Sequence, residues 1–182
     1  MAFVATIDAC VLHRPPVRDL LIRLAVKRLF RLSWSERILD EMVHSVLRAR
    51  PDLTPDQLTR TRDLMVEALP AAMTEGYEPL IEALPLPDPD DRHVLAVAIR
   101  SGAQVIVTDN LRDFPAEILG VYDIEAQSAD TFVTYLVDLS PATILDTLAE
   151  QARTLTDMSV DRLLDTLARD GLVNAVEAVR SL

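Results

Sequence analysis

Cysteine, glycine, lysine and aromatic residues are scarce in this chain of 182 residues. The single cysteine, Cys10, excludes an internal disulfide framework and a metal site built from several thiolates. The four glycines form no Gly-rich phosphate loop, and no Gly-x-Ser-x-Gly motif is present, which argues against nucleotide-loop enzymes and serine hydrolases. The three histidines lack the spacing of a zinc site, and we expect His44 and His93 to lie on helix surfaces.

Long apolar runs are also missing. No run approaches the roughly 20 residues of a membrane-spanning helix, and the N-terminus reaches Asp8 before a signal-like apolar core develops. We therefore expect a cytoplasmic protein without a membrane contact. Hydrophobic residues make up 49% of the chain and charged residues 26%, which is typical of a folded globular protein with one principal core.

The charge is unevenly distributed. Residues 1–62 hold 11 Arg and Lys against 7 Asp and Glu, whereas residues 63–182 hold 7 against 22, which together give the net charge of −11. The basic N-terminal part is suited to contacts with phosphates. The same arginines are equally compatible with ordinary solvated helix faces.

The order of elements predicts an α/β fold. Residues 3–7 and 104–108 are apolar runs of the fully buried type, and shorter strands are expected near residues 30–34 and 121–124. Helical patterns follow from Pro15, from a capping box formed by Ser33 and Glu36, from Pro55, from Asp88 to Gly102, and over residues 129–137. Residues 69–87 are rich in proline and are expected to be irregular.

This alternation implies a three-layer α/β/α arrangement around a short central parallel sheet, which we assign to residues 1–137. Residues 138–182 show only helical patterns and are expected to form an all-helical C-terminal extension. Its two or three amphipathic helices are too few for a robust core, so we expect them to pack on the main domain or on another subunit.

Acidic residues occur where predicted strands end or helices begin: Asp8, Glu41, Asp88, Asp90, Asp91, Asp109 and Asp113. The group at 88–91 also fits an ordinary helix start, and Glu41 fits a polar helix face. Asp8 favours a functional site over these ordinary structural roles. An acid directly after a buried strand is unfavourable for the strand, but it is useful at the crevice where parallel strands end. Converging carboxylates would repel one another unless a cation lay between them, and Mg²⁺ or Mn²⁺ fits oxygen ligands.

Two other classes that combine a metal with carboxylates are disfavoured by single positions. A haloacid-dehalogenase-like phosphatase needs a second Asp two residues after the first, and Cys10 stands there. Such a phosphatase and a response-regulator receiver both need a late lysine, whereas the only lysine is Lys27.

The order of four motifs resembles the PIN domain, and more narrowly the VapC-type toxins of bacterial toxin–antitoxin pairs. The motifs are Asp8 with residues 9–12, Glu41 within residues 38–42, Asp91 within residues 88–96, and residues 107–115. The resemblance covers residues 1–137, and the tail is similar to a helical extension that a subset of these toxins carries. It implies a metal-dependent endoribonuclease.

By motif position the resemblance implies that Asp8, Glu41, Asp91 and Asp113 are catalytic. It implies metal binding by Asp8, Asp91, Asp113 and Asp109, and the choice between Asp109 and Asp113 as the fourth acid stays open, as does the choice between one metal ion and two. Thr108 and Asn110 belong to the fourth motif and are expected to bind the substrate. Three arginines near the acids in sequence are candidates for binding RNA phosphates: Arg14, Arg18 and Arg92.

The resemblance also implies an RNA substrate and a cognate antitoxin that would place a basic side chain in the acidic cleft. A homodimer is our default expectation, because two-fold assemblies are the commonest oligomers. The alternative functions are a PIN-like module that binds RNA or protein without cleavage, and a scaffolding role for the helical tail.

Overall fold

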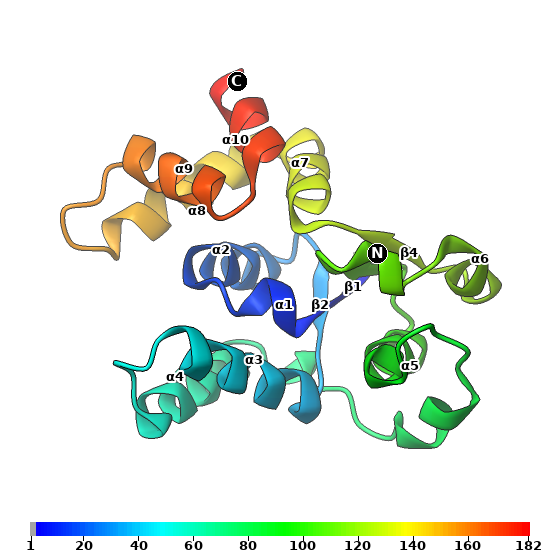
Figure 1. Cartoon of the computed structure of the whole chain (residues 1–182). Coiled ribbons are helices and arrows are strands. Elements are labelled where there is room, and N and C mark those ends of the chain that lie inside the picture. Colours follow the sequence, from blue (N-terminus) through cyan, green and yellow to red (C-terminus); the bar gives the residue numbers. More distant parts are fainter. Residues whose placement is uncertain (1–2) are drawn as a thin grey trace.

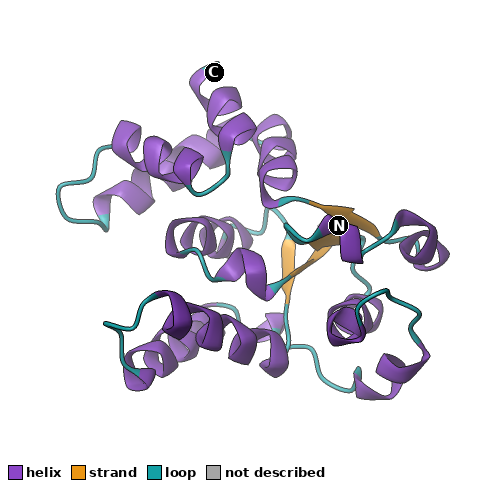
Figure 2. Cartoon of the chain, viewed as in Figure 1, coloured by secondary structure: helices purple, strands orange, loops and turns teal. Residues whose placement is uncertain are grey.

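The computed structural model describes residues 3–182 and has a parallel sheet of four short strands at its centre (Figure 2). The strands are β1 (Val4–Ile7), β2 (Arg31–Ser33), β3 (Val105–Val107) and β4 (Glu125–Gln127), in the spatial order β2-β1-β3-β4. Thr6 pairs with Ser33, and Ile7 pairs with Val107. The carboxyl ends of β1 and β3 therefore lie side by side, which is where the sequence predicted the site.

Helices cover the sheet on both sides (Figure 1). Helix α2 (Pro15–Val26) connects β1 to β2, whereas α5 (Arg92–Ser101) leads back to β3 on the other side of β1. Because both crossovers are right-handed by rule and run in opposite directions, the two helices lie on opposite faces. The predicted three-layer α/β/α fold is confirmed.

The core on the α2 side contains an aromatic cluster. Phe30 and Phe132 meet edge to face with ring centroids 5.1 Å apart, and Phe3 lies 6.2 Å from Phe30 and 6.0 Å from Phe132. Phe132 belongs to α7 (Ala129–Leu139), so this cluster fixes α7 against the start of β1. Edge-to-face aromatic pairs of this kind add about 1 kcal/mol each beyond their buried area.

The remaining elements of the main domain connect these layers. They are α1 (Ala9–Leu12), α3 (Glu36–Ala49), α4 (Pro55–Ala68), α6 (Ala116–Leu119) and the 3-10 turns η1 (Pro70–Ala72), η2 (Glu78–Ala83), η3 (Pro89–Asp91), η4 (Leu111–Asp113) and η5 (Gly120–Tyr122). Thr54 caps α4 in a full capping box with Gln57. The region 69–87 is irregular apart from two 3-10 turns, close to the prediction.

Two predicted boundaries are wrong. Ser33 does not cap α3, because it belongs to β2 and pairs with Thr6; the cap is Ser35, whose hydroxyl accepts a hydrogen bond from the N–H of Ile38 at 3.3 Å. The last strand begins at Glu125 and not at 121, because η5 and the left-handed residue Asp123 interrupt the chain there. The β-branched pattern at 121–124 pointed to the wrong segment, since Val121 is 76% exposed.

The C-terminal extension consists of α8 (Pro141–Arg153), α9 (Val160–Arg169) and α10 (Val173–Arg180). Helix α8 lies on α2, and α10 lies on α7 (Figure 1). Asp130 at the start of α7 accepts hydrogen bonds from the backbone N–H groups of Asn174 at 3.1 Å and Ala175 at 2.9 Å. The extension thus packs on the main domain. The predicted boundary at 137/138 falls inside α7, and residues 1 and 2 of the predicted domain lie outside the described residues.

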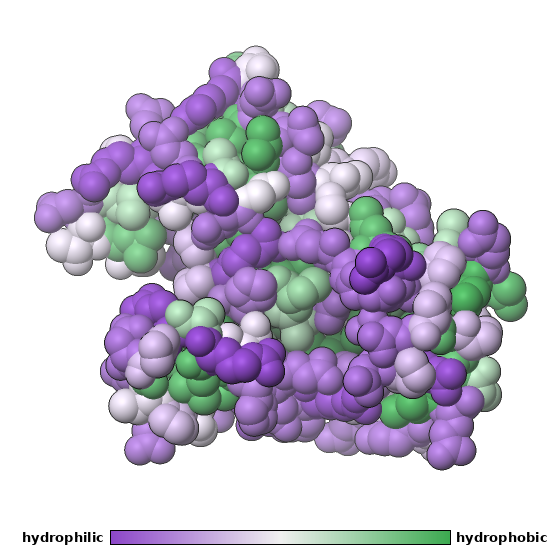
Figure 3. Space-filling view, viewed as in Figure 1, coloured by the Kyte–Doolittle hydropathy of each residue, from purple (hydrophilic) through white to green (hydrophobic). Residues whose placement is uncertain are grey.

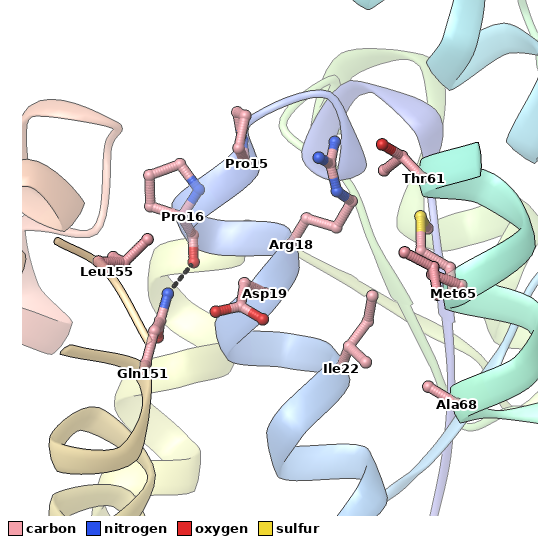
Figure 4. A pocket seen from close by; sticks show the side chains of 11 residues that line it. Pro15, Pro16, Arg18, Asp19, Ile22, Thr61, Met65, Ala68, Gln151 and Leu155 are labelled. Carbon is pink, nitrogen blue, oxygen red and sulfur yellow. Dashed lines mark hydrogen bonds between the residues drawn. The ribbon is translucent and has the colours of Figure 1, made fainter. Parts of the chain in front are cut away.

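A groove of about 420 Å³ lies between α2, α4 and the C-terminal end of α8. Ile22 and Met65 form its apolar walls, and Arg18 and Asp19 enter it from α2 (Figure 4). The side-chain amide of Gln151 donates to the carbonyl of Pro16 at 3.0 Å. Figure 3 shows the surface hollowed on this side, between the extension and the helices α3 and α4. The extension and the main domain therefore both line this groove.

Among residues 3–182, no single helix has the length and apolar character needed to cross a membrane; α7 and α8 reach that length only together, across a bend of 117°.

The end of α5 provides a test of the backbone geometry. Gly102 adopts φ +67°, as predicted for a helix-terminating glycine, whereas Gly120 adopts φ −60°, and neither position has an atom within 4 Å of an added Cβ. We predict that Gly102→Ala lowers the free energy of unfolding by roughly 1 to 2 kcal/mol, the cost of a left-handed L-residue. Gly120→Ala is the control and should leave stability unchanged or slightly higher. Urea unfolding of both variants measures this; equal stabilities would contradict it.

Candidate metal centre

Asp8 is fixed at the end of β1 by the sheet itself. Its backbone N–H donates to the carbonyl of Val107 at 3.0 Å, which continues the ladder between β1 and β3. The side chain is buried, and its Oδ2 accepts hydrogen bonds from the Thr108 hydroxyl at 2.8 Å and from the Cys10 thiol at 3.3 Å. Both donors are neutral, so they orient the carboxylate without cancelling its charge.

A group of three acids lies beside Asp8. One carboxylate oxygen from each of Asp88, Asp91 and Asp113 lies within 4.8 Å of the others. These residues come from the turn before η3, from η3 and from η4, so segments far apart in the sequence supply them. The side-chain amide of Asn110 donates to Asp113 at 2.5 Å and to Asp91 at 3.4 Å, and thus holds the two acids together.

The charges of the group change the pKa of Asp91. Burial, followed by the negative charges of Asp8, Asp88 and Asp113, raises the pKa of Asp91 from its ordinary 3.8 to about 6. The charge of Asp8 therefore acts on the same place as the three-acid group. A cation between these carboxylates would reverse the repulsion.

Glu41 is outside this group; it is linked to α5, the helix that follows Asp91, through His93, and it is supported differently. It occupies the exposed side of α3, where its Oε1 accepts from the ring Nε2 of His93 at 3.0 Å and from Arg37 at 3.2 Å. Burial alone would raise the pKa of Glu41, but the hydrogen bond and charge of His93, and then those of Arg37, outweigh it and lower the pKa. Glu41 is therefore favoured in its ionised form, whereas the surroundings of Asp91 oppose ionisation.

The expectation that His93 lies on a helix surface is wrong, because its side chain is only 1% exposed. Helix α5 is apolar on all sides, with five consecutive buried residues after His93. That run was the signal that a histidine in this helix would be buried and would need a polar partner. His44, by contrast, lies on the exposed face of α3, as expected.

Asp109 is directed away from the three-acid group. One of its oxygens accepts from the guanidinium of Arg14, and the other accepts from the backbone N–H of Ala129 at 3.3 Å. Asp113, four residues later, lies inside the group. Of the two residues left open as the fourth acid, the geometry favours Asp113.

The predicted phosphate-binding arginines have different surroundings. Arg14 is occupied by Asp109 and by the carbonyl of Asp170, and the guanidinium of Arg18 donates to the carbonyl of Leu12 at 2.9 Å at the edge of the groove. Arg92 begins α5 and is half-buried.

Two other arginines, which sequence reasoning missed, flank the acids. Arg37 contacts Glu41, and Arg112, 88% exposed, lies 3.6 Å from Asp113. Their closeness to the acids depends on the approach of α3 to η3 and on the 3-10 turn η4.

The donor set fits a hard divalent cation. Cys10 is the only sulfur ligand available, and burial together with the charge of Asp8 raises the pKa of its thiol to about 12, so it stays protonated. The remaining donors are carboxylate and hydroxyl oxygens, which suit Mg²⁺ or Mn²⁺.

Comparison with known proteins agrees with this geometry. A PIN domain family model matches residues 5–112, and a model of the VapC50 C-terminal domain matches residues 129–181. A protein of Mycobacterium tuberculosis (strain ATCC 25618 / H37Rv), named "Putative ribonuclease VapC50", is 45% identical over 71 residues, which span 39% of this chain and 41% of that protein. No solved structure matches the chain. The resemblance to VapC-type PIN proteins with a helical extension is confirmed.

The raised pKa of Asp91 predicts a pH-dependent stability of the metal-free protein. The folded protein keeps a proton on Asp91 up to about pH 6, whereas the unfolded chain releases it near pH 4, so this group's contribution to stability is lost as pH rises between these values. Asp91→Asn should stabilise the metal-free protein at pH 7 by about 1 kcal/mol, after allowance for solvent screening. Below pH 4 the variant and the wild type should be equal.

Chemical denaturation in EDTA at pH 7 and near pH 4 measures this difference. Asp90→Asn is the matched control, because Asp90 is an exposed acid of the same turn that lies outside the three-acid group. If Asp91→Asn and Asp90→Asn change stability at pH 7 by the same amount, Asp91 is not under strain from its neighbours.

Proposed function

This chain belongs to the PIN domain family, and we propose that it is a metal-dependent endoribonuclease, which hydrolyses phosphodiester bonds in RNA. The observation that carries the proposal is the group formed by Asp88, Asp91 and Asp113 beside Asp8, in which burial and then the charges of the other acids raise the pKa of Asp91. Asp88 also caps its own turn by accepting from the N–H of Asp90 at 2.9 Å, but three acids gathered in one place disfavour their ionised forms unless a cation lies among them. Asp88 is an addition to the acids assigned from the motifs.

The residues divide into two roles. Asp8, Asp91 and Asp113 would hold Mg²⁺ or Mn²⁺, and Asn110 fixes the spacing of the last two. The bound ion would supply an activated water and would offset charge that develops on the phosphate. Glu41, kept ionised by His93 and Arg37, would accept a proton from that water or hold it in position.

Contacts with the RNA backbone would come from the rim of the site. Arg37 and Arg112 lie beside the acids, and their guanidinium groups suit the oxygens of a phosphate. Arg92 remains a candidate because it begins the helix that follows Asp91. Thr108 and Asn110, which the sequence predicted as substrate-binding residues, would in this proposal position the acids, since their side chains bond to Asp8, Asp91 and Asp113.

We further propose that the protein is the toxin of a toxin–antitoxin pair. The support is the similarity to a protein named as a VapC ribonuclease, over 41% of that protein, and the match to the VapC50 C-terminal domain. A cognate antitoxin would silence the site by placing a basic side chain among the carboxylates. An RNA substrate places the activity in the cytoplasm, and a homodimer remains our default assembly.

Cleavage of labelled RNA tests the proposal. Purified protein with Mg²⁺ or Mn²⁺ should cut RNA, EDTA should stop the reaction, and Asp8→Asn, Asp91→Asn and Glu41→Gln should each lower kcat/KM by at least roughly a hundredfold. Asp40→Asn is the control, since Asp40 precedes Glu41 on α3 but is exposed and its carboxylate pairs with Arg62. It should retain nearly full activity.

The binding-only alternative makes a different prediction in the same assay. A non-catalytic module would bind RNA equally in all variants and would leave it intact with either metal. If folded wild-type protein, free of any copurified partner, binds RNA but never cuts it, the nuclease proposal is wrong. Binding of Mn²⁺ measured by calorimetry then decides whether the acids hold an ion at all.

A further inference from the structure

Arg14 joins the extension to the edge of the metal centre. It precedes α2, its side chain is only 17% exposed, and its two terminal nitrogens bond in different directions. Nη1 donates to the carbonyl of Asp170 in the turn between α9 and α10, and Nη2 donates to Asp109, which follows β3. One guanidinium therefore contacts the tail and the segment that carries Thr108, Asn110 and Asp113.

Asp109 continues this connection toward the acids. Its second oxygen accepts from the N–H of Ala129, and its own N–H donates to the sulfur of Cys10 at 3.4 Å. Cys10 in turn donates to Asp8. An unbroken series of contacts thus leads from the turn after α9 to Asp8.

The tail has a glycine at the point where the Arg14 side chain approaches it. Gly171, the residue after Asp170, adopts φ +102°, and a Cβ built there would lie 2.9 Å from Nη1 of Arg14. Any side chain would therefore strain the backbone and displace the guanidinium. This observation comes from the tail and is independent of the contacts of Asp109.

Attachment of the tail does not depend on Arg14. Lys27 pairs with Glu150 at 2.8 Å, Asp130 holds the start of α10, and Gln151 bonds to Pro16. The Nε of Arg14 is buried without a partner among the described residues, which is a cost to stability. A costly contact that is not required for attachment points to a role at the site.

We propose that Arg14 is a positioning residue through which the helical extension fixes Asp109, and with it the segment 108–113 that orients Asp8, Asp91 and Asp113. The extension is then part of the machinery of the site. The activity readouts rest on the proposed nuclease function, whereas the exchange and metal-binding readouts do not. An RNA phosphate contact by Arg14, the role expected from the sequence, is the competing outcome.

The test compares Arg14→Met with Lys27→Met. Both substitutions remove a cation that links the main domain to the extension. Among the described residues, however, Lys27 pairs with Glu150 in the last turn of α8 and with no acid of the site. Hydrogen exchange, Mn²⁺ binding by calorimetry, and kcat and KM for RNA cleavage are measured on the full chain. Arg14→Met should speed exchange in residues 108–113, weaken Mn²⁺ binding several-fold, and lower kcat roughly tenfold with little change in KM. Lys27→Met should change none of these.

The tail side provides a second variant pair. Gly171→Ala should reproduce the effects of Arg14→Met, while Gly102→Ala, at another left-handed glycine with no atom near its Cβ, should not. Arg14→Met combined with Asp109→Asn should cost little more than either change alone, since each breaks the same connection.

Two results would overturn the proposal. If Arg14→Met raises KM while kcat, Mn²⁺ affinity and exchange in residues 108–113 stay at wild-type values, Arg14 is a phosphate contact. If Arg14→Met and Lys27→Met have equal effects on all readouts, Arg14 only helps to attach the tail. Should the wild type cut no RNA, exchange and Mn²⁺ binding still decide the positioning role, and only the proposed function fails.

Discussion

Repulsion among carboxylates at the ends of β1 and β3 is the constraint on which the rest of the structure depends. Burial and the charges of Asp8, Asp88 and Asp113 together hold the pKa of Asp91 near 6, so the folded chain resists the ionisation that separate acids would accept. The fold keeps these acids together by means that are independent of charge. The ladder between β1 and β3 fixes Asp8, and Asn110 bonds to both Asp91 and Asp113. A cation among these acids would relieve their repulsion.

The acids of the site are supported in two different ways, and the difference separates their roles. Within residues 3–182, the side chains of Asp8 and Asp91 have only neutral hydrogen-bond donors, from Thr108, Cys10 and Asn110, so no cationic side chain offsets their charge there. Glu41 instead contacts an imidazole and a guanidinium, which lower its pKa. Acids whose surroundings push their pKa values apart are suited to different tasks at one pH. In our proposal, the uncompensated acids bind the metal ion and the compensated one handles the proton.

Local sequence patterns predicted the elements, and tertiary contacts decided the details. The two buried strands, β1 and β3, could be predicted from their apolar runs. The acid after each run could be given a role as well. A carboxylate there is unfavourable for the strand, but it is useful in a site at the sheet edge. The start of β4 could not, since its sequence Glu-Ala-Gln owes its strand state to pairing with β3. The pairing of His93 with Glu41 and the contact of Asp109 with Arg14 depend on helix placement and on the tail, which no local pattern specifies. The four motifs therefore pointed to one edge of the sheet but not to the direction in which each side chain points.

The segment after β3 has little regular structure of its own, and the extension lies where it can support this segment. Residues 108–113 contain one 3-10 turn and no α-helix, and such segments open at low cost unless they are tied to a core. The sheet beside this segment is small, since no strand of the described sheet exceeds four residues. Helices α8 to α10 add buried apolar side chains next to α2 and α7, and the turn after α9 reaches Arg14 from that rigid base. A segment that must hold Asp113 beside Asp91 against repulsion benefits from such an anchor, because a displacement of about 1 Å at a reacting centre is enough to slow a reaction by roughly a hundredfold.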